Sequence, residues 1–205
     1  MKLLLSSCDF LNDKSRKVIL DNLDKNLSYY KVLFIPNEKA TYDSIHSDKY
    51  YDRLKKDGFT NRDNIYIFDE VESDKFRGLD IDIIYVGGGN TFAMLDKIRK
   101  ANFCDEIINY VKNGVMYIGG SCGAHIVSKN IGHLIELDDN YVGINNYDGL
   151  GLLDGVILPH YAEDDYNPKL REEVYNRLIN ENKYKVYKLT NDESLIVIDG
   201  DVKIV

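Results

Sequence analysis

The chain has 205 residues, 44% of them hydrophobic, and a formal net charge of −8 at pH 7. This length predicts a single domain over 1–205, and the charge argues against a nucleic-acid-binding protein. No stretch approaches the ~20 apolar residues of a membrane span. The three cysteines lack metal-ligand spacing, so the composition predicts a cytoplasmic protein with free thiols and without a metal site.

The first part of the chain alternates short apolar runs with helical patterns. Strands are predicted over 2–5, 31–35, 64–68, 80–86 and 115–118, and helices over 10–23, 41–57, 91–100 and 102–113. Strands that alternate with helices form a mostly parallel sheet that is covered on both faces. Ligands of such sheets bind at the carboxyl ends of the strands, which is where we expect the functional site.

Beyond residue 130 the pattern changes, with short strand-like runs over 134–137 and 156–158. An amphipathic helix is predicted over 168–180, and strands over 185–189, 194–199 and 202–205. Asp199-Gly200 is a typical hairpin turn. No internal repeat or linker interrupts the chain, which supports the prediction of one domain.

The most informative stretch is Gly119-Gly120-Ser121-Cys122-Gly123, which follows an apolar run and precedes a short apolar pattern. This order predicts a strand, a tight turn and a helix, with Ser121 held at the turn as in a nucleophile elbow. Glycines let the strand and the helix pass closely, and the helix N-terminus faces a developing negative charge. A phosphate-binding turn is the alternative for such a motif.

A nucleophilic serine requires a base, and His160 is the predicted one. It follows the strand-like run 156–158 and Pro159, so it reaches the same edge of the sheet as Ser121. His46 lies in a polar helix and His133 precedes a strand-like run. His125, on the helix after Ser121, is expected to point away from the serine.

The base in turn requires an orienting group, and three of the acidic residues between Ser121 and His160 are candidates for it. These candidates are Glu136, Asp138 and Asp139. A carboxylate at any of them gives the order serine, acid, histidine. Asp164 and Asp165 are weaker candidates because their segment has the composition of a solvated acidic loop.

The run Gly87-Gly88-Gly89 follows another predicted strand and is expected to supply half of an oxyanion hole, with Gly88 and Gly89 as donors. Consecutive glycines let backbone N–H groups point into a cavity. The amide of Cys122 is the expected third donor, with its side chain turned elsewhere. The spacing of a phosphate-binding P-loop is absent from this run.

Four motifs together resemble the dipeptidase E and cyanophycinase family of serine peptidases. They are the runs 86–92, 119–124, 148–153 and 158–161, which occur in family order along essentially the whole chain. The resemblance implies an α/β three-layer sandwich with a mostly parallel central sheet, like the flavodoxin-like fold of class I glutamine amidotransferases. It also implies that 1–205 is a single peptidase domain.

The resemblance further implies roles for individual residues. Ser121 is the nucleophile, His160 the base, and Asp138 the best match for the orienting aspartate, with Glu136 and Asp139 still open. Arg171 stands in a place comparable to the arginine that holds the acidic side chain of dipeptidase E substrates. The chain departs from the family at Cys122, where alanine is usual, and in the acidic segment 161–167.

The sequence therefore predicts a serine peptidase that hydrolyses short peptides without a metal or organic cofactor. Dipeptides with an N-terminal aspartate are one substrate class, and Asn90 is expected to help hold the substrate's N-terminus. The expected partner is a small peptide, with no nucleic acid or membrane, and the chain is a monomer or a homodimer. The alternative is a catalytically decayed binding module of the same fold, and a typical α/β-hydrolase esterase is a third hypothesis.

Overall fold

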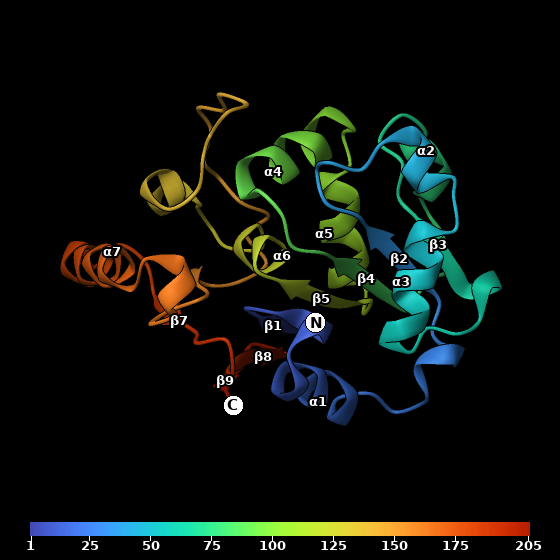
Figure 1. Cartoon of the computed structure of the whole chain (residues 1–205), viewed down its shortest axis with the longest axis horizontal. Coiled ribbons are helices and arrows are strands. Elements are labelled where there is room, and N and C mark those ends of the chain that lie inside the picture. The colour runs from blue at the N-terminus through green and yellow to red at the C-terminus, as the bar shows by residue number, and fades with distance from the viewer.

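A seven-stranded sheet runs through the computed structural model, which describes residues 1–205 (Figure 1). Its strands lie in the order β3-β2-β4-β5-β1-β8-β9. They are β1 (Lys2–Ser6), β2 (Val32–Ile35), β3 (Ile65–Ile67), β4 (Ile83–Val86), β5 (Met116–Gly120), β8 (Ser194–Ile198) and β9 (Asp201–Ile204). The first five strands pair in parallel, and β8 and β9 add an antiparallel hairpin beside β1. The mostly parallel sheet is therefore confirmed.

Helices cover both faces of this sheet because successive strand residues point to opposite sides. Leu3 and Leu5 of β1 belong to a core that includes residues of α4 (Thr91–Lys100) and α5 (Cys104–Lys112). Leu4, between them, belongs to the opposite core with residues of α1 (Asp13–Asp21) and α3 (Lys49–Asp57). The predicted three-layer α/β sandwich is confirmed, and no helix is long and apolar enough to cross a membrane.

A smaller unit lies beside the main sheet. It is formed by the parallel strands β6 (Val156–Leu158) and β7 (Val186–Lys188) and by α7 (Pro168–Glu181). Val174 and Leu178 of α7 pack against Val156 of β6. In Figure 1 this unit, in orange, extends from the sheet on the side away from β3.

Three predicted elements differ in the structure. The helix expected over 41–57 is two helices, α2 (Tyr42–Ile45) and α3, because polar side chains after α2 bond back to its carbonyl groups. His46 Nδ1 lies 2.9 Å from the Tyr42 carbonyl oxygen, and the Ser47 hydroxyl donates to Ser44. The helix expected over 10–23 begins only at α1, whose amides Asn12 caps.

The strand-like run 134–137 is not a strand. It lies mostly in a 3₁₀ helix over Gly132–Glu136, where the Leu134 carbonyl accepts from both Leu137 and Asp138. The other 3₁₀ helices are Asp9–Leu11, Leu27–Tyr29, Arg62–Asn64, Ser73–Phe76 and Asp164–Tyr166. The hairpin turn predicted at Asp199-Gly200 is confirmed, with φ of +50° and +97° between β8 and β9.

Candidate active site

Ser121 follows β5 directly and begins the short helix α6 (Cys122–His125), so the predicted strand, turn and helix are present. Its backbone is strained, with φ +49° and ψ −109°. Glycine is required on both sides of the turn. A Cβ on Gly119 would lie 2.5 Å from the Gly123 carbonyl oxygen, and one on Gly123 would lie 2.3 Å from that of Val86.

His160 follows β6 and Pro159 and reaches Ser121 as the sequence predicts. Its Nε2 lies 3.0 Å from Ser121 Oγ, the separation of a hydrogen bond. The residue is buried and has a φ of +56°, a conformation that needs support from its surroundings. That support comes from Ser7, whose Oγ accepts from the His160 amide at 3.0 Å and donates to the Thr190 carbonyl at 2.8 Å.

The other ring nitrogen of His160 contacts Asn191, which the sequence analysis missed. Nδ1 lies 2.7 Å from Asn191 Oδ1, in the loop that joins β7 to β8. The Asn191 amide donates to Glu163 Oε1 at 2.7 Å, which fixes the loop beside the histidine. The sequence offers no signal for this residue, because a single asparagine in a polar turn is ordinary.

Asp138 does not contact His160, in contrast to its expected place as the orienting acid. Its carboxylate accepts from the Thr91 amide and from Asn90 Nδ2, both at 2.7 Å. The physical reason is that unpaired N–H groups at the N-terminus of α4 attract a carboxylate. The alternatives do not take the place either, since Glu136 pairs with Arg177 and the ring nitrogens of His160 contact Asn191 and Ser121, not Asp139.

Arg171 is buried at the site and is not a solvated helix residue. Its Nη1 donates to the Pro159 carbonyl at 2.8 Å and its Nε to the Tyr166 carbonyl at 2.9 Å. The Tyr166 ring in turn stacks on the imidazole of His160. Arg171 therefore holds the segment that carries both His160 and the Tyr166 ring that stacks on it. The acidic residues of that segment, Asp164 and Asp165, are exposed.

The glycine turn after β4 lies beside Ser121. A Cβ on Gly88 would lie only 3.7 Å from the Ser121 Cβ. Gly89 has a φ of +156°, and a Cβ there would lie 2.2 Å from Glu38 Oε2. The N–H groups of Gly88 and Gly89 donate to no protein acceptor, so they are free to bind an oxyanion.

At Cys122 the backbone amide is available for hydrogen bonding, and the thiol is not. As the first residue of α6 its amide has no acceptor within the helix. The side chain is fully buried, with Sγ 3.8 Å from the Asn90 carbonyl oxygen. Burial, together with Glu38 and Asp138, raises the pKa of this thiol well above its usual value, which disfavours the nucleophilic thiolate.

Asn90 is not placed to hold a substrate. Its Oδ1 caps α4 by accepting from the Ala93 amide at 2.9 Å, and its Nδ2 donates to Asp138 and to the Asp139 carbonyl. The expected role in binding the substrate's N-terminus is therefore not supported, because capping occupies the side chain.

A cavity of about 120 Å³ opens onto Ser121 and His160. The other lining residues are Gly89, Thr91, His125, Leu134, Leu137, Asp138, Tyr166 and Arg171. His125 thus faces the site, contrary to expectation, with Nδ1 3.0 Å from Thr91 Oγ1. Burial lowers its pKa well below the usual value, with smaller contributions from His133, Arg171 and His160. The His125 imidazole is therefore neutral near pH 7.

The electrostatics of His160 suit a base at neutral pH. Burial is the main cause that lowers its pKa below the usual 6.5, and the charge of Arg171 acts in the same direction. The Asn191 hydrogen bond and the charge of Glu163 oppose this shift without reversing it. The imidazole is consequently neutral near pH 7 and is able to accept a proton from Ser121.

Comparisons with known proteins show which proteins this chain resembles. An uncharacterized peptidase of Listeria monocytogenes is 33% identical over 125 residues, which are 59% of this chain and 58% of that peptidase. Peptidase E of Salmonella arizonae is 38% identical over 81 residues, which are 40% of this chain and 34% of that enzyme. The chain therefore spans less than two thirds of the length of these relatives.

Structural similarity covers a larger share of this chain than the sequence matches do. A crystal structure of a candidate peptidase E from Listeria monocytogenes EGD-e superposes with a TM-score of 0.76 at 25% identity. The superposition covers the whole of this chain and 97% of that one. The sequence profile of peptidase family S51 matches residues 3–205. Because that match covers almost the entire chain, the protein belongs to peptidase family S51.

Proposed function

We propose that the protein is a serine peptidase that hydrolyses short peptides. The observation that carries this proposal is the hydrogen-bonded row from Ser121 Oγ to His160 Nε2 and from His160 Nδ1 to Asn191 Oδ1. A nucleophile, a base and an orienting group in line are the parts required for acyl transfer. Family membership and the peptidases among its relatives support the same reaction class.

In the proposed mechanism Ser121 Oγ attacks the scissile carbonyl carbon while His160 Nε2 takes its proton. The protonated imidazole then gives that proton to the leaving amine, and water hydrolyses the acyl-enzyme by the same route in reverse. Asn191 replaces Asp138 as the orienting group of this proposal. Its Oδ1 accepts from Nδ1–H, which leaves the Nε2 lone pair directed at the serine.

The proposed oxyanion hole consists of the amides of Gly88, Gly89 and Cys122. Three observations support this assignment. Gly88 approaches Ser121 closely, the N–H groups of the glycine turn have no protein acceptor, and Cys122 lies at the start of α6. A single donor of this kind typically contributes about 3 kcal/mol to transition-state stabilisation.

Arg171 is the proposed contact for an acidic group of the substrate, such as the side chain of an N-terminal aspartate. It lines the cavity, and its Nη2 is free while Nε and Nη1 are bound to backbone carbonyls. The small cavity suits one short side chain, so the proposal favours dipeptides and aminoacyl amides over long chains. Asp138, also on the cavity wall, is the proposed partner of the substrate's free ammonium group.

The test is hydrolysis of a panel of dipeptides and aminoacyl amides, half with N-terminal aspartate, by wild type and Ser121→Ala. Cleavage confined to Asp-X and lost in the variant supports both the mechanism and the specificity. Cleavage of other peptides retains the mechanism and removes the role of Arg171. Full activity in Ser121→Ala contradicts the mechanism.

If no peptide is cleaved, labelling with a fluorophosphonate decides between an untested substrate and a binding module. A reactive Ser121 retains the hydrolase proposal. An unreactive serine in the folded protein favours the decayed site.

A further inference from the structure

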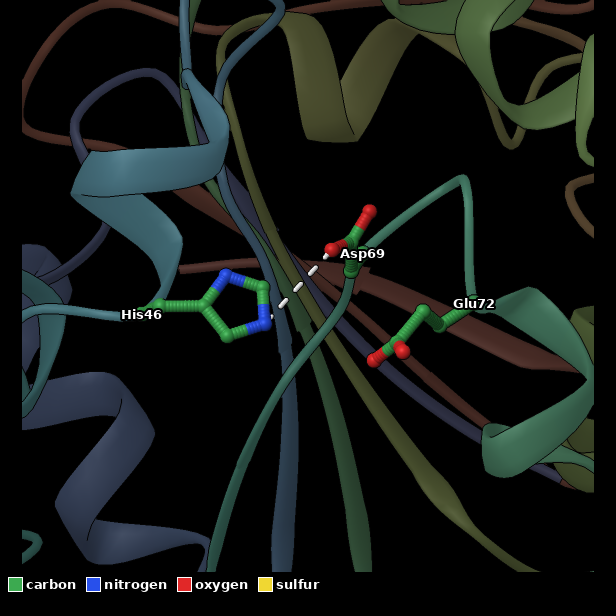
Figure 2. A group of neighbouring side chains, drawn as sticks. All are labelled: His46, Asp69 and Glu72. Atoms are coloured by element: carbon green, nitrogen blue, oxygen red, sulfur yellow. Dashed lines mark ion pairs between the residues drawn. The ribbon is translucent and has the colours of Figure 1, made fainter.

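A second cluster of ionisable side chains lies far from Ser121 along the sheet. It consists of His46, Asp69 and Glu72, and each offers one ligand atom within 4.8 Å of the others (Figure 2). His46 follows α2, and the two acids lie in the loop that follows β3, the edge strand of the sheet. Strands β2 and β4 separate β3 from β5, which Ser121 follows, so the cluster is independent of the proposed catalytic row.

Asp69 is the residue that makes this cluster unusual. The residue is only 3% exposed, and its Oδ2 is a buried atom without any hydrogen-bond partner. Oδ1 is bound to the Val71 amide at 2.9 Å, so the unpartnered oxygen has a fixed direction. A buried carboxylate oxygen without a partner is costly unless a cation or a donor compensates it.

The unpartnered oxygen faces His46. The distance from Asp69 Oδ2 to His46 Nε2 is 3.8 Å, too long for a hydrogen bond. Two ligands of a tetrahedral zinc ion, each about 2.1 Å from the metal, lie about 3.4 Å apart. The observed separation is therefore near the spacing of two metal ligands.

The orientation of the imidazole agrees with metal binding. His46 Nδ1 lies 2.9 Å from the Tyr42 carbonyl oxygen, an acceptor that requires a proton on Nδ1. The lone pair of the neutral ring is then on Nε2, which points toward Asp69. Metal-bound histidines typically have this arrangement, with the second nitrogen donating to a backbone carbonyl.

Glu72 supplies the third ligand and approaches from the other side of Asp69 (Figure 2). In the absence of an ion the Glu72 carboxylate pairs with Lys75 at 2.6 Å. The Lys75 side chain is 66% exposed, so this is a surface ion pair. Surface ion pairs of this kind contribute at most about 1 kcal/mol, so a divalent cation displaces the lysine at low cost. Glu72 is partly exposed, which gives its side chain freedom to close on an ion, whereas His46 is already held toward Asp69.

We propose that His46, Asp69 and Glu72 form a binding site for a divalent transition-metal ion, with zinc as the best match. One imidazole and two carboxylates are borderline to hard ligands that suit Zn²⁺, and their two negative charges balance the ion. Water completes the coordination from the exposed side. Bound metal joins α2 to the loop after β3, so its role is to stabilise this edge of the fold.

The test uses the untagged chain of 205 residues, stripped with a chelator and returned to chelator-free buffer. Zn²⁺ is titrated by calorimetry and by competition with a chromophoric indicator, and the Tm is measured with and without the ion. We expect one Zn²⁺ per chain in wild type and a raised Tm, because an ion that binds only the folded state stabilises it. His46→Ala, at an exposed position, should weaken binding at least tenfold and abolish the rise in Tm.

Asp74→Asn is the matched control, because Asp74 lies close to Glu72 in the chain but is 94% exposed and pairs with Arg77 at 2.9 Å. It should bind Zn²⁺ as wild type does, while Glu72→Gln should bind it more weakly. The absence of saturable binding in wild type overturns the proposal. So does a His46→Ala variant that binds Zn²⁺ with unchanged affinity.

Discussion

The rings of His160 and Tyr166 stack with their centroids 3.8 Å apart and their planes at 3° to each other. Tyr166 thus covers one face of the base, and Arg171 holds it there through its backbone carbonyl. The stack limits rotation of the imidazole and reduces its exposure to water. We therefore expect the tyrosine to influence activity without taking part in proton transfer.

Replacement of Tyr166 tests the importance of this cover. We expect Tyr166→Ala to reduce kcat/KM about tenfold, equivalent to about 1.4 kcal/mol, the upper range for an aromatic pair. Tyr166→Phe retains the ring and should retain the activity. Steady-state kinetics on the best dipeptide substrate measure both, and equal losses in the two variants would assign the effect to the hydroxyl instead.

The pH dependence of hydrolysis follows from the electrostatics of His160. Its pKa lies below 6.5 mainly because of burial, and only the neutral imidazole is a base. Activity should therefore rise with pH, with the midpoint of the acidic limb of kcat/KM below 6.5. A midpoint clearly above 6.5 would show that another group controls the reaction.

Asn191 offers a sharper test because aspartate, a residue of nearly the same size, adds a negative charge at this position. Asn191→Asp places a carboxylate against Nδ1, which stabilises the imidazolium and raises the pKa of His160. The acidic limb should then move to higher pH while the reaction is retained. Asn191→Ala removes the orienting group and should lower kcat by about 10² to 10⁴. If Asn191→Ala is fully active, the contact has no role in catalysis.

The thiol of Cys122 should be inert in the folded protein, since it is fully buried and its pKa is raised. We expect alkylation in native buffer, mapped by mass spectrometry, to leave Cys122 unmodified until denaturant is added. Cys122→Ala should remain active because its amide is unchanged, with a loss of about 1 kcal/mol of stability. Loss of activity in a folded Cys122→Ala protein would indicate a direct role for the sulfur.

The buried imidazole of His133 is expected to make the protein less stable in acid. Burial lowers its pKa to about 4, while its Nε2 lies 3.1 Å from the Ile157 carbonyl oxygen. Between pH 6.5 and 4 the unfolded chain binds a proton that the folded chain does not, so stability falls as pH falls. At pH 5 this costs about 2 kcal/mol relative to pH 7.

His133→Gln keeps a donor for the Ile157 carbonyl and removes the titration. Urea denaturation of both proteins at pH 7 and pH 5 measures the difference. We expect the variant to lose about 2 kcal/mol less than wild type over this range. An equal loss in the two proteins would assign the acid sensitivity to other groups, of which His125 is the first to examine.

The sequence predicted the parts of the site that rest on local pattern. Ser121 and His160 both follow apolar strands, and glycine or proline marks the end of each strand. The backbone geometry requires both glycines, because β5 and α6 pass too closely for a Cβ at Gly119 or at Gly123. The mostly parallel sheet was predictable for a similar reason, because strands alternate with helices along the first part of the chain.

The contact between His160 and Asn191 was not predictable because it depends on packing between distant segments. Asn191 lies 31 residues after His160 in a polar loop, and only the docking of β7 beside β6 brings it to the imidazole. Asp138 lay in the expected order along the chain, but the N-terminus of α4 is its nearer and more favourable partner. Competition between two acceptable partners of one carboxylate is decided by tertiary structure.

The hydroxyl of Ser7 connects the amide of His160 to the carbonyl of Thr190, so three distant parts of the chain meet in one contact. Ser7 and Thr190 are 183 residues apart in the chain, so their contact forms only after the segments that carry them have packed together. Loosening of either segment would remove the support of the left-handed backbone at His160. The alignment of His160 with Ser121 therefore depends on the packing of both segments and not on local structure alone.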